Sequence, residues 1–436
     1  MEFFSSILSL LINQESVTRL KAADLEHWME GAAQIVLASL LTPERAPDPL
    51  AESSVAEHVA AVGAAGMDAS VQGVWLQAGN QIVAEHQGTV PLSAASLTKI
   101  PTTLAALATW PADHRFETGL SMTGTIANGV LQGDLVVQAG GDPFFVWEEA
   151  IALANTLANL GITRVAGNLV VSDRFAMNFQ TDPAIAGALL KQGMNADLWN
   201  SEAATQYQTL PAGTPRPQLV IDGSVQVQSD AAISALGAKP ILRHQSLALV
   251  DVLHAMNTYS NNVMADMMAD NVGGAQVVAQ KAAALANVPS DEIQLINGSG
   301  LGNANKISPR AVVAMLRAIQ GRVNASGLNV ADVFPVIGRD RGTLGGRSLP
   351  PGAAVKTGTL NDVSSLAGVF PTRDRGLVWF AVINVGTADL KLLHRQQDLL
   401  IDRLTEQWGD TPLPELAPGD RTDSRRLGEP RRNQPI

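Results

Sequence analysis

Cysteine is absent from this chain of 436 residues, and its absence removes several kinds of chemistry. It excludes thiol nucleophiles, zinc sites with cysteine ligands and disulfide bonds, and it is compatible with either redox compartment. The seven histidines are far apart in the sequence and form no HExxH pair, which would place two imidazoles on one helical face. We therefore expect no metal and no other cofactor, so any catalysis would depend on oxygen and nitrogen groups.

Positive charge and long apolar runs are also scarce. The formal net charge is −11, and such a chain lacks the basic face that neutralises phosphates, so we exclude nucleic acid as a partner. No run of 18 apolar residues occurs, so we expect a soluble body without a membrane-spanning helix. Hydrophobic residues make up 46% of the chain, enough to bury one large core and a second, smaller one.

The N-terminal region leaves three interpretations open. Phe3 to Ile12 is an apolar run of signal-peptide length, but Glu2 stands where a positive charge is expected and no A-x-A cleavage site follows. The run could be a signal peptide, an uncleaved anchor or an amphipathic helix. A helical period over residues 18–41 precedes a proline-rich linker, so we treat residues 1–47 as an N-terminal helical segment and linker.

The rest of the chain divides into segments that differ in composition and in expected secondary structure. Residues 116–239 consist of short β-like runs between glycine turns and predict a β-rich inserted domain with its own core. Residues 48–115 and 240–410 combine a hairpin, helical stretches and three late strands, which predicts one α/β domain interrupted by the insert. Residues 411–436 are rich in proline, glycine and charge, and we expect a disordered tail there.

The first chemical motif is Ser96-Leu97-Thr98-Lys99. Of the eight lysines, only Lys99 has a serine three residues before it. At this spacing on a helix the two side chains share a face, so an amine can take the proton of a hydroxyl that attacks a carbonyl. Taken alone, the motif favours an ordinary helix start, with Ser96 as the N-cap and Lys99 in solvent.

Two further motifs follow in order and change this balance. Ser260, Asn261 and Asn262 interrupt an apolar helical stretch at residues 256–268, where buried polar groups would need partners. The strand-like segment Lys356-Thr357-Gly358-Thr359 then offers a cation, two hydroxyls and a glycine that lets another backbone approach closely. S-x-x-K, S-x-N and K-T-G in this order are the set found in penicillin-binding proteins and class A β-lactamases.

With these motifs the sequence resembles the D-alanyl-D-alanine carboxypeptidases/endopeptidases of the low-molecular-mass class C penicillin-binding proteins. Further stretches that look like that family extend the likeness over roughly residues 70–405: RFET, LQGDLVVQAGGDP, a GxLVVSDRF-like stretch, NGSGLGNANKISPR and GRDRGTLGGR. The resemblance implies an α/β fold, a β-lactamase/transpeptidase-like (penicillin-recognising) domain with the insert between the first two motifs. The gap of 164 residues between Ser96 and Ser260 is short for this family.

The resemblance also implies roles for individual residues. Ser96 would attack the peptide carbonyl with Lys99 as general base, and Ser260 would relay a proton to the leaving amine. Asn262 would orient Lys99 and the substrate amide. Lys356 and Thr357 would bind the terminal carboxylate of the substrate.

In the K-T-G strand, Gly358 would leave room for the substrate backbone. The backbone N–H groups of Ser96 and Thr359 would form an oxyanion hole. The implied ligands are peptidoglycan peptides that end in D-Ala-D-Ala, with β-lactams as inhibitors. The implied location is the periplasm or cell envelope.

Two other functions remain open at this stage. Tyr259-Ser260-Asn261 also satisfies the Y-x-N element of class C β-lactamases, one residue out of register with Ser260/Asn262. On a helix such a shift rotates a side chain by about 100°, so only one register can face a cleft. A wall-binding protein that keeps the fold without turnover is the alternative from another class. Pro101, in the first turns of the expected helix, is predicted to remove one hydrogen bond and favour a kink.

Overall fold

The computed structural model describes residues 43–412, 416, 417, 419, 421 and 425–436. Residues 43–46 group with Asn80–Ile82, and the other described residues form a second, much larger unit. In the first unit, β1 (Glu44–Arg45) pairs in parallel with Gln81 and Ile82. The expected helix at 18–41 and the apolar run before it lie outside the described residues. Within the described part of the chain, no helix combines the length and apolarity needed to cross a membrane.

The centre of the large unit is an antiparallel sheet with the order β3-β2-β18-β17-β16. The predicted hairpin forms its first two strands, and the three late strands complete it: β2 (Gln72–Ala78), β3 (Gln81–His86), β16 (Ala354–Leu360), β17 (Val363–Thr372) and β18 (Gly376–Val385). Alternate residues Val378, Phe380 and Val382 of β18 enter one core beneath α3 (Pro49–Ala64) and α13 (Leu390–Trp408).

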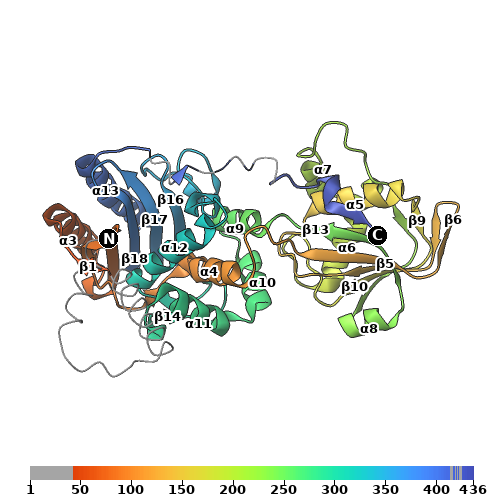
Figure 1. Ribbon diagram of the computed structural model, residues 1–436, viewed down its shortest axis with the longest axis horizontal. Helices are drawn as coiled ribbons and strands as arrows, with labels where there is room; N and C mark the ends of the chain where they lie inside the picture. The colour runs from red at the N-terminus through yellow and green to blue at the C-terminus, as the bar shows by residue number, and fades with distance from the viewer. Residues whose placement is uncertain (1–42, 413–415, 418, 420, 422–424) are drawn as a thin grey trace, which may run out of the picture. The chain divides into compact units, whose positions relative to one another are not determined.

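A group of helices covers the other face of this sheet (Figure 1). The helix α12 packs on β2, β17 and β18 and also contacts α4, which in turn contacts α9, α10 and α11. These helices are α4 (Lys99–Thr109), α9 (Leu249–Thr258), α10 (Asn262–Val272), α11 (Ala275–Ala286) and α12 (Pro309–Asn324). A small antiparallel sheet of β4 (Leu92–Ser93), β15 (Lys306–Ile307) and β14 (Ile293–Gln294) leads into α4.

The inserted domain has its own sheets and core, but it is not built of strands alone. One sheet has the order β12-β10-β8-β5-β13-β19 and a second has the order β11-β9-β7-β6. The strands are β5 (Glu117–Met122), β6 (Thr125–Ala127), β7 (Val130–Gln132), β8 (Leu135–Gln138), β9 (Arg164–Val165), β10 (Leu169–Ser172), β11 (Val220–Ile221), β12 (Val225–Gln228) and β13 (Lys239–Gln245). Helices α5 (Trp147–Asn159), α6 (Pro183–Gly193), α7 (Ser201–Tyr207) and α8 (Asp230–Ala235) lie between them. The strand β13 pairs with β5 along its length, so the insert continues to Gln245 instead of ending at 239.

The C-terminal segment differs from the expected disordered tail. The strand β19 (Asn433–Pro435) pairs with β13 and extends the sheet of the insert. Arg432 is buried, where it donates to the carboxylate of Glu149 over 2.5 Å. The composition of the segment is that of a disordered chain, but a few specific ion pairs and a strand edge order the residues that the structure describes.

Candidate active site

The first motif occupies the junction between a short turn and α4. A 3-10 turn at Ala95–Thr98 carries Ser96, and α4 begins at Lys99. The two side chains meet, with Lys99 Nζ 3.1 Å from Ser96 Oγ. Lys99 is fully buried and Ser96 caps no helix, so both differ from an ordinary helix start. Pro101 is the third residue of α4, so it lies in the first turn, before the helix interior in which a proline is most disruptive.

The second motif lies in a loop, not within one helix as the sequence suggested. The helix α9 ends at Thr258, and α10 begins at Asn262 with Asn261 as its N-cap. Ser260 adopts the left-handed conformation with φ 51°, so the rotation expected along one continuous helix does not apply. Backbone strain of this kind at a non-glycine residue is typical of functional sites.

This loop brings Ser260 and Asn262 to the two lysines. Asn262 Oδ1 accepts a hydrogen bond from Lys99 Nζ over 2.7 Å, and Ser260 Oγ lies 2.9 Å from Lys356 Nζ. The side chain of Tyr259, the residue of the competing register, is 68% exposed. The geometry therefore favours the S-x-N register over the Y-x-N register.

The third motif forms the edge strand β16, which packs against the turn that carries Ser96. A Cβ atom on Gly358 would lie 2.9 Å from Ser96 N, so only glycine permits this approach. Lys356 is buried and also donates to the Thr357 carbonyl over 2.7 Å. Thr359 is exposed on the same strand. All three motifs thus meet at one place.

Burial determines the electrostatics of the two lysines. Burial lowers the pKa of Lys99 to about 7, although the charge of Asp266 acts in the opposite direction. Burial also lowers the pKa of Lys356, and the positive charge of Lys99 lowers it further. In the described part of the chain, neither ammonium has a carboxylate within salt-bridge distance. Such a site can supply a neutral amine near pH 7 to take a proton from Ser96.

The model of the D-Ala-D-Ala carboxypeptidase 3 (S13) family matches residues 52–205 and 216–406. The chain belongs to this family. It is 26% identical over 391 residues to the D-alanyl-D-alanine carboxypeptidase DacB of Haemophilus influenzae, a match that covers 68% of this chain and 81% of that protein. The family expected from the motifs is thereby confirmed.

Solved structures share the fold of this chain. A predatory peptidoglycan endopeptidase of Bdellovibrio bacteriovorus superposes with a TM-score of 0.67 at 21% identity, covering 81% of this chain and 98% of that one. Penicillin binding protein 4 (dacB) of Haemophilus influenzae superposes with a TM-score of 0.56 at 21% identity, covering 80% and 99%. The expected penicillin-recognising α/β fold is confirmed.

Two residues of this S13 site were not assigned a role from the sequence. The carbonyl oxygen of Ser299 accepts from Lys99 Nζ over 2.9 Å. The hydroxyl of Thr343 lies 2.8 Å from that of Thr357. Both belong to stretches that resembled the family, NGSGLGNANKISPR and GRDRGTLGGR, but a sequence pattern alone does not say which residue of such a stretch reaches the motifs.

Metal ligands do not gather in the part of the chain that the structure describes. No group of three or more His, Asp or Glu side chains there is arranged to hold a metal ion.

Proposed function

We propose that this chain is a serine-type D-alanyl-D-alanine carboxypeptidase/endopeptidase that cuts peptidoglycan stem peptides through an acyl-enzyme on Ser96. The observation that supports this most directly is the meeting of the three motifs. One lysine, Lys99, lies 3.1 Å from Ser96 Oγ and 2.7 Å from Asn262 Oδ1, while the other, Lys356, lies 2.9 Å from Ser260 Oγ.

In the proposed acylation, neutral Lys99 takes the proton of Ser96 as Oγ attacks the carbonyl carbon of the penultimate D-alanine. The backbone N–H groups of Ser96 and Thr359 stabilise the negative charge on the carbonyl oxygen. Ser260 then passes a proton to the nitrogen of the leaving D-alanine, and Lys356 returns a proton to Ser260 over the 2.9 Å contact. Breakage of the C–N bond leaves the ester on Ser96, and water later hydrolyses it.

The K-T-G strand supplies substrate binding in this proposal. A peptide that lies along β16 can pair with it as an added strand, because β16 is the edge strand of its sheet. Gly358 serves a different purpose, since its missing side chain lets the turn that carries Ser96 pack against the strand. Its terminal carboxylate then accepts from the Thr357 hydroxyl and lies near the ammonium of Lys356. Penicillins carry a carboxylate in the corresponding position, so the same contacts bind them. The substrate places the protein in the cell envelope, in the periplasm where one exists.

Mass spectrometry of the intact protein after incubation with penicillin G tests the proposal. We expect a stable adduct of one penicillin, absent from the Ser96→Ala variant, together with release of D-alanine from a peptide that ends in D-Ala-D-Ala. Rapid hydrolysis of penicillin without an adduct would identify a β-lactamase. Absence of both adduct and hydrolysis would indicate a wall-binding protein without turnover.

A further inference from the structure

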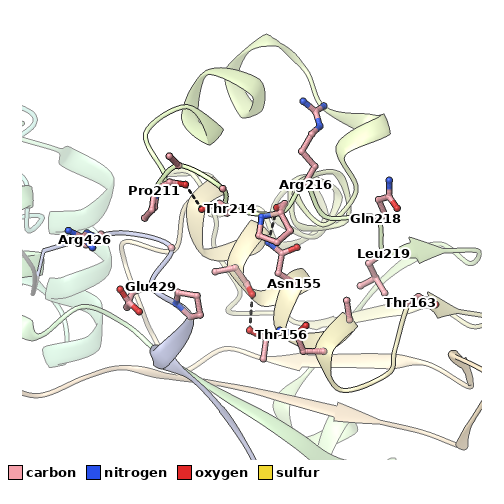
Figure 2. A pocket seen from close by; sticks show the side chains of 18 residues that line it. Asn155, Thr156, Thr163, Pro211, Thr214, Arg216, Gln218, Leu219, Arg426 and Glu429 are labelled. Atoms are coloured by element: carbon pink, nitrogen blue, oxygen red, sulfur yellow. Dashed lines mark hydrogen bonds between the residues drawn. The ribbon is translucent and has the colours of Figure 1, made fainter.

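A pocket of about 620 Å³ lies in the inserted domain, away from the three motifs. It is lined by α5 from Ala152 onward, by the loop 211–219 and by residues 426–430 of the C-terminal segment. Figure 2 shows Arg426 and Glu429 on the side of the C-terminal segment, with Gln218 and Leu219 opposite them. No residue of the catalytic motifs is among its described lining residues. The volume is that of an ordinary small-molecule site.

The walls of this pocket are held in place before any ligand binds. The Tyr207 hydroxyl donates to the Thr214 carbonyl over 2.5 Å, and the Asn155 side chain donates to the Pro215 carbonyl over 2.9 Å. These bonds tie the loop 211–219 to α5 and to the end of α7. A pocket with fixed walls loses little conformational freedom on binding.

The lining combines amide and hydroxyl groups with small apolar side chains. Asn159, Gln218 and Thr163 are exposed polar residues at its rim, whereas Ala152 and Leu219 are buried apolar residues. Side-chain amides donate and accept at once, which suits hydroxyl and amide groups of a ligand. The methyl groups suit an apolar face or an acetyl group.

The charges around the pocket argue against a strongly charged ligand. The guanidinium of Arg216 lies 4.8 Å from the ring centroid of Trp199 and also near the ring of Tyr207. Its charge therefore already makes cation–π contacts within the domain. Arg426 and Glu429 bring opposite charges to the same wall. The balance fits a neutral ligand or one with a single carboxylate, and it does not fit a polyphosphate.

We propose that this pocket binds an N-acetylated amino sugar of the peptidoglycan glycan strand. The inference rests on the proposed function, because the glycan is the part of that polymeric substrate that carries hydroxyl and acetamido groups. A second contact with the same polymer raises the effective concentration of stem peptides at Ser96. The insert thus directs the enzyme to assembled wall instead of to free peptide.

Calorimetric titration of the full chain with an N-acetylglucosamine tetrasaccharide and with the peptide-free N-acetylglucosamine–N-acetylmuramic acid disaccharide tests the pocket. We expect binding of both sugars, and a loss of at least about tenfold in affinity when Ala158→Trp fills the pocket or when Asn159 and Gln218 are both changed to alanine. Ala231→Trp, an exposed alanine on α8 that does not line the pocket, is the matched control and should bind as the parent does.

Catalysis is measured separately on two substrates. Ala158→Trp should leave penicillin acylation and D-alanine release from a soluble peptide unchanged, and it should lower release from insoluble wall. The sugar proposal is wrong if the parent chain binds neither sugar, or if both pocket variants bind them normally. Sugar binding without any acylation would instead overturn the proposed function and leave the pocket assignment standing. Binding of the disaccharide alone would show that the muramic carboxylate, not the acetamido group, is recognised, and would overturn the assignment as stated.

Discussion

The catalytic cleft and the inserted domain both bury charged side chains, but the two lysines of the cleft have no ion-pair partner among the described residues, whereas the insert contains the buried ion pair of Arg432 and Glu149. In the cleft, Lys99 and Lys356 contact hydroxyl, amide and carbonyl oxygens. In the insert, Arg432 donates to the Glu149 carboxylate, and the backbone N–H of Gly428 donates to the same oxygen over 3.2 Å. Burial without a counter-charge lowers the pKa of each lysine.

This difference separates groups that react from groups that hold the fold. A lysine that must accept a proton near pH 7 cannot be held as a cation by a carboxylate. An arginine that fixes the C-terminal segment to the insert has no such requirement. The two regions should therefore respond differently to the loss of one buried group, the cleft in rate and the insert in stability.

The largest effect should come from Ser96→Ala, which removes the nucleophile. We expect penicillin acylation to fall by about 10⁴-fold or more, because residues that act as a catalytic unit have effects of that size. The free energy of unfolding should change by less than about 0.5 kcal/mol, since Ser96 caps no helix. Fluorescent penicillin labelling and urea unfolding measure the two quantities. A variant that still labels at the parent rate would remove Ser96 from the mechanism.

Ser260→Ala should slow acylation by about 10²- to 10⁴-fold, the usual contribution of a general acid/base group. Tyr259→Phe is the matched control, because its side chain is 68% exposed and belongs to the competing register. Stopped-flow acylation rates compare the two. If Tyr259→Phe were the damaging change and Ser260→Ala nearly silent, the β-lactamase-like register would be correct.

In the insert, Arg432→Met should lower the free energy of unfolding by about 3–5 kcal/mol, because it leaves the buried Glu149 carboxylate without its partner. The double variant with Glu149→Gln should recover much of that loss. Penicillin acylation by the folded variant should be unchanged. Urea unfolding and acylation rates measure the two responses. If Arg432→Met lowered the acylation rate as much as a cleft variant does, the proposed difference between the two regions would be wrong.

The sequence predicted the elements that have a local pattern and missed features that depend on the conformation of a single residue. The hairpin and the three late strands could be predicted, because each is a run of β-forming residues bounded by turn residues. The meeting of the motifs was inferred from their order. The loop at Ser260 was not foreseen, since its left-handed conformation occurs at a serine and no glycine marks the turn in the sequence.

The prediction of a disordered tail at the C-terminus was wrong for a related reason. The segment contains few apolar residues, and a composition of that kind predicts disorder if no specific contact with the rest of the chain is considered. Arg432 and β19 gain order from Glu149 and β13, residues more than 180 positions away in the sequence. Single contacts of this kind leave no periodic signal.

Thr357→Val should lower kcat/KM for a D-Ala-D-Ala peptide by about ten- to hundredfold, the value of one charge-assisted hydrogen bond to the terminal carboxylate. Amidation of that carboxylate should cost a similar factor, and the two losses should not add because they remove the same contact. Thr343→Val, which keeps the Thr357 hydroxyl but removes its 2.8 Å partner, should cost less. Steady-state kinetics on both peptides decide this, and full additivity would mean that the strand does not recognise the carboxylate.

The smallest expected effect is a loss of about tenfold in acylation rate at pH 6, which results from protonation of Lys99. Its pKa in the folded protein is lowered to about 7 by burial, so the neutral amine that can accept a proton predominates above that pH and becomes scarce below it. The acylation rate with penicillin should therefore rise with pH up to about 7 and level off above it. The drug carries the same charge over pH 5–9, so the profile reports the enzyme. Stopped-flow rates across that range, with circular dichroism as a control for folding, measure the profile. A flat rate between pH 6 and 8 would mean that Lys99 is not the base, and the unpaired burial of its ammonium would then need another explanation.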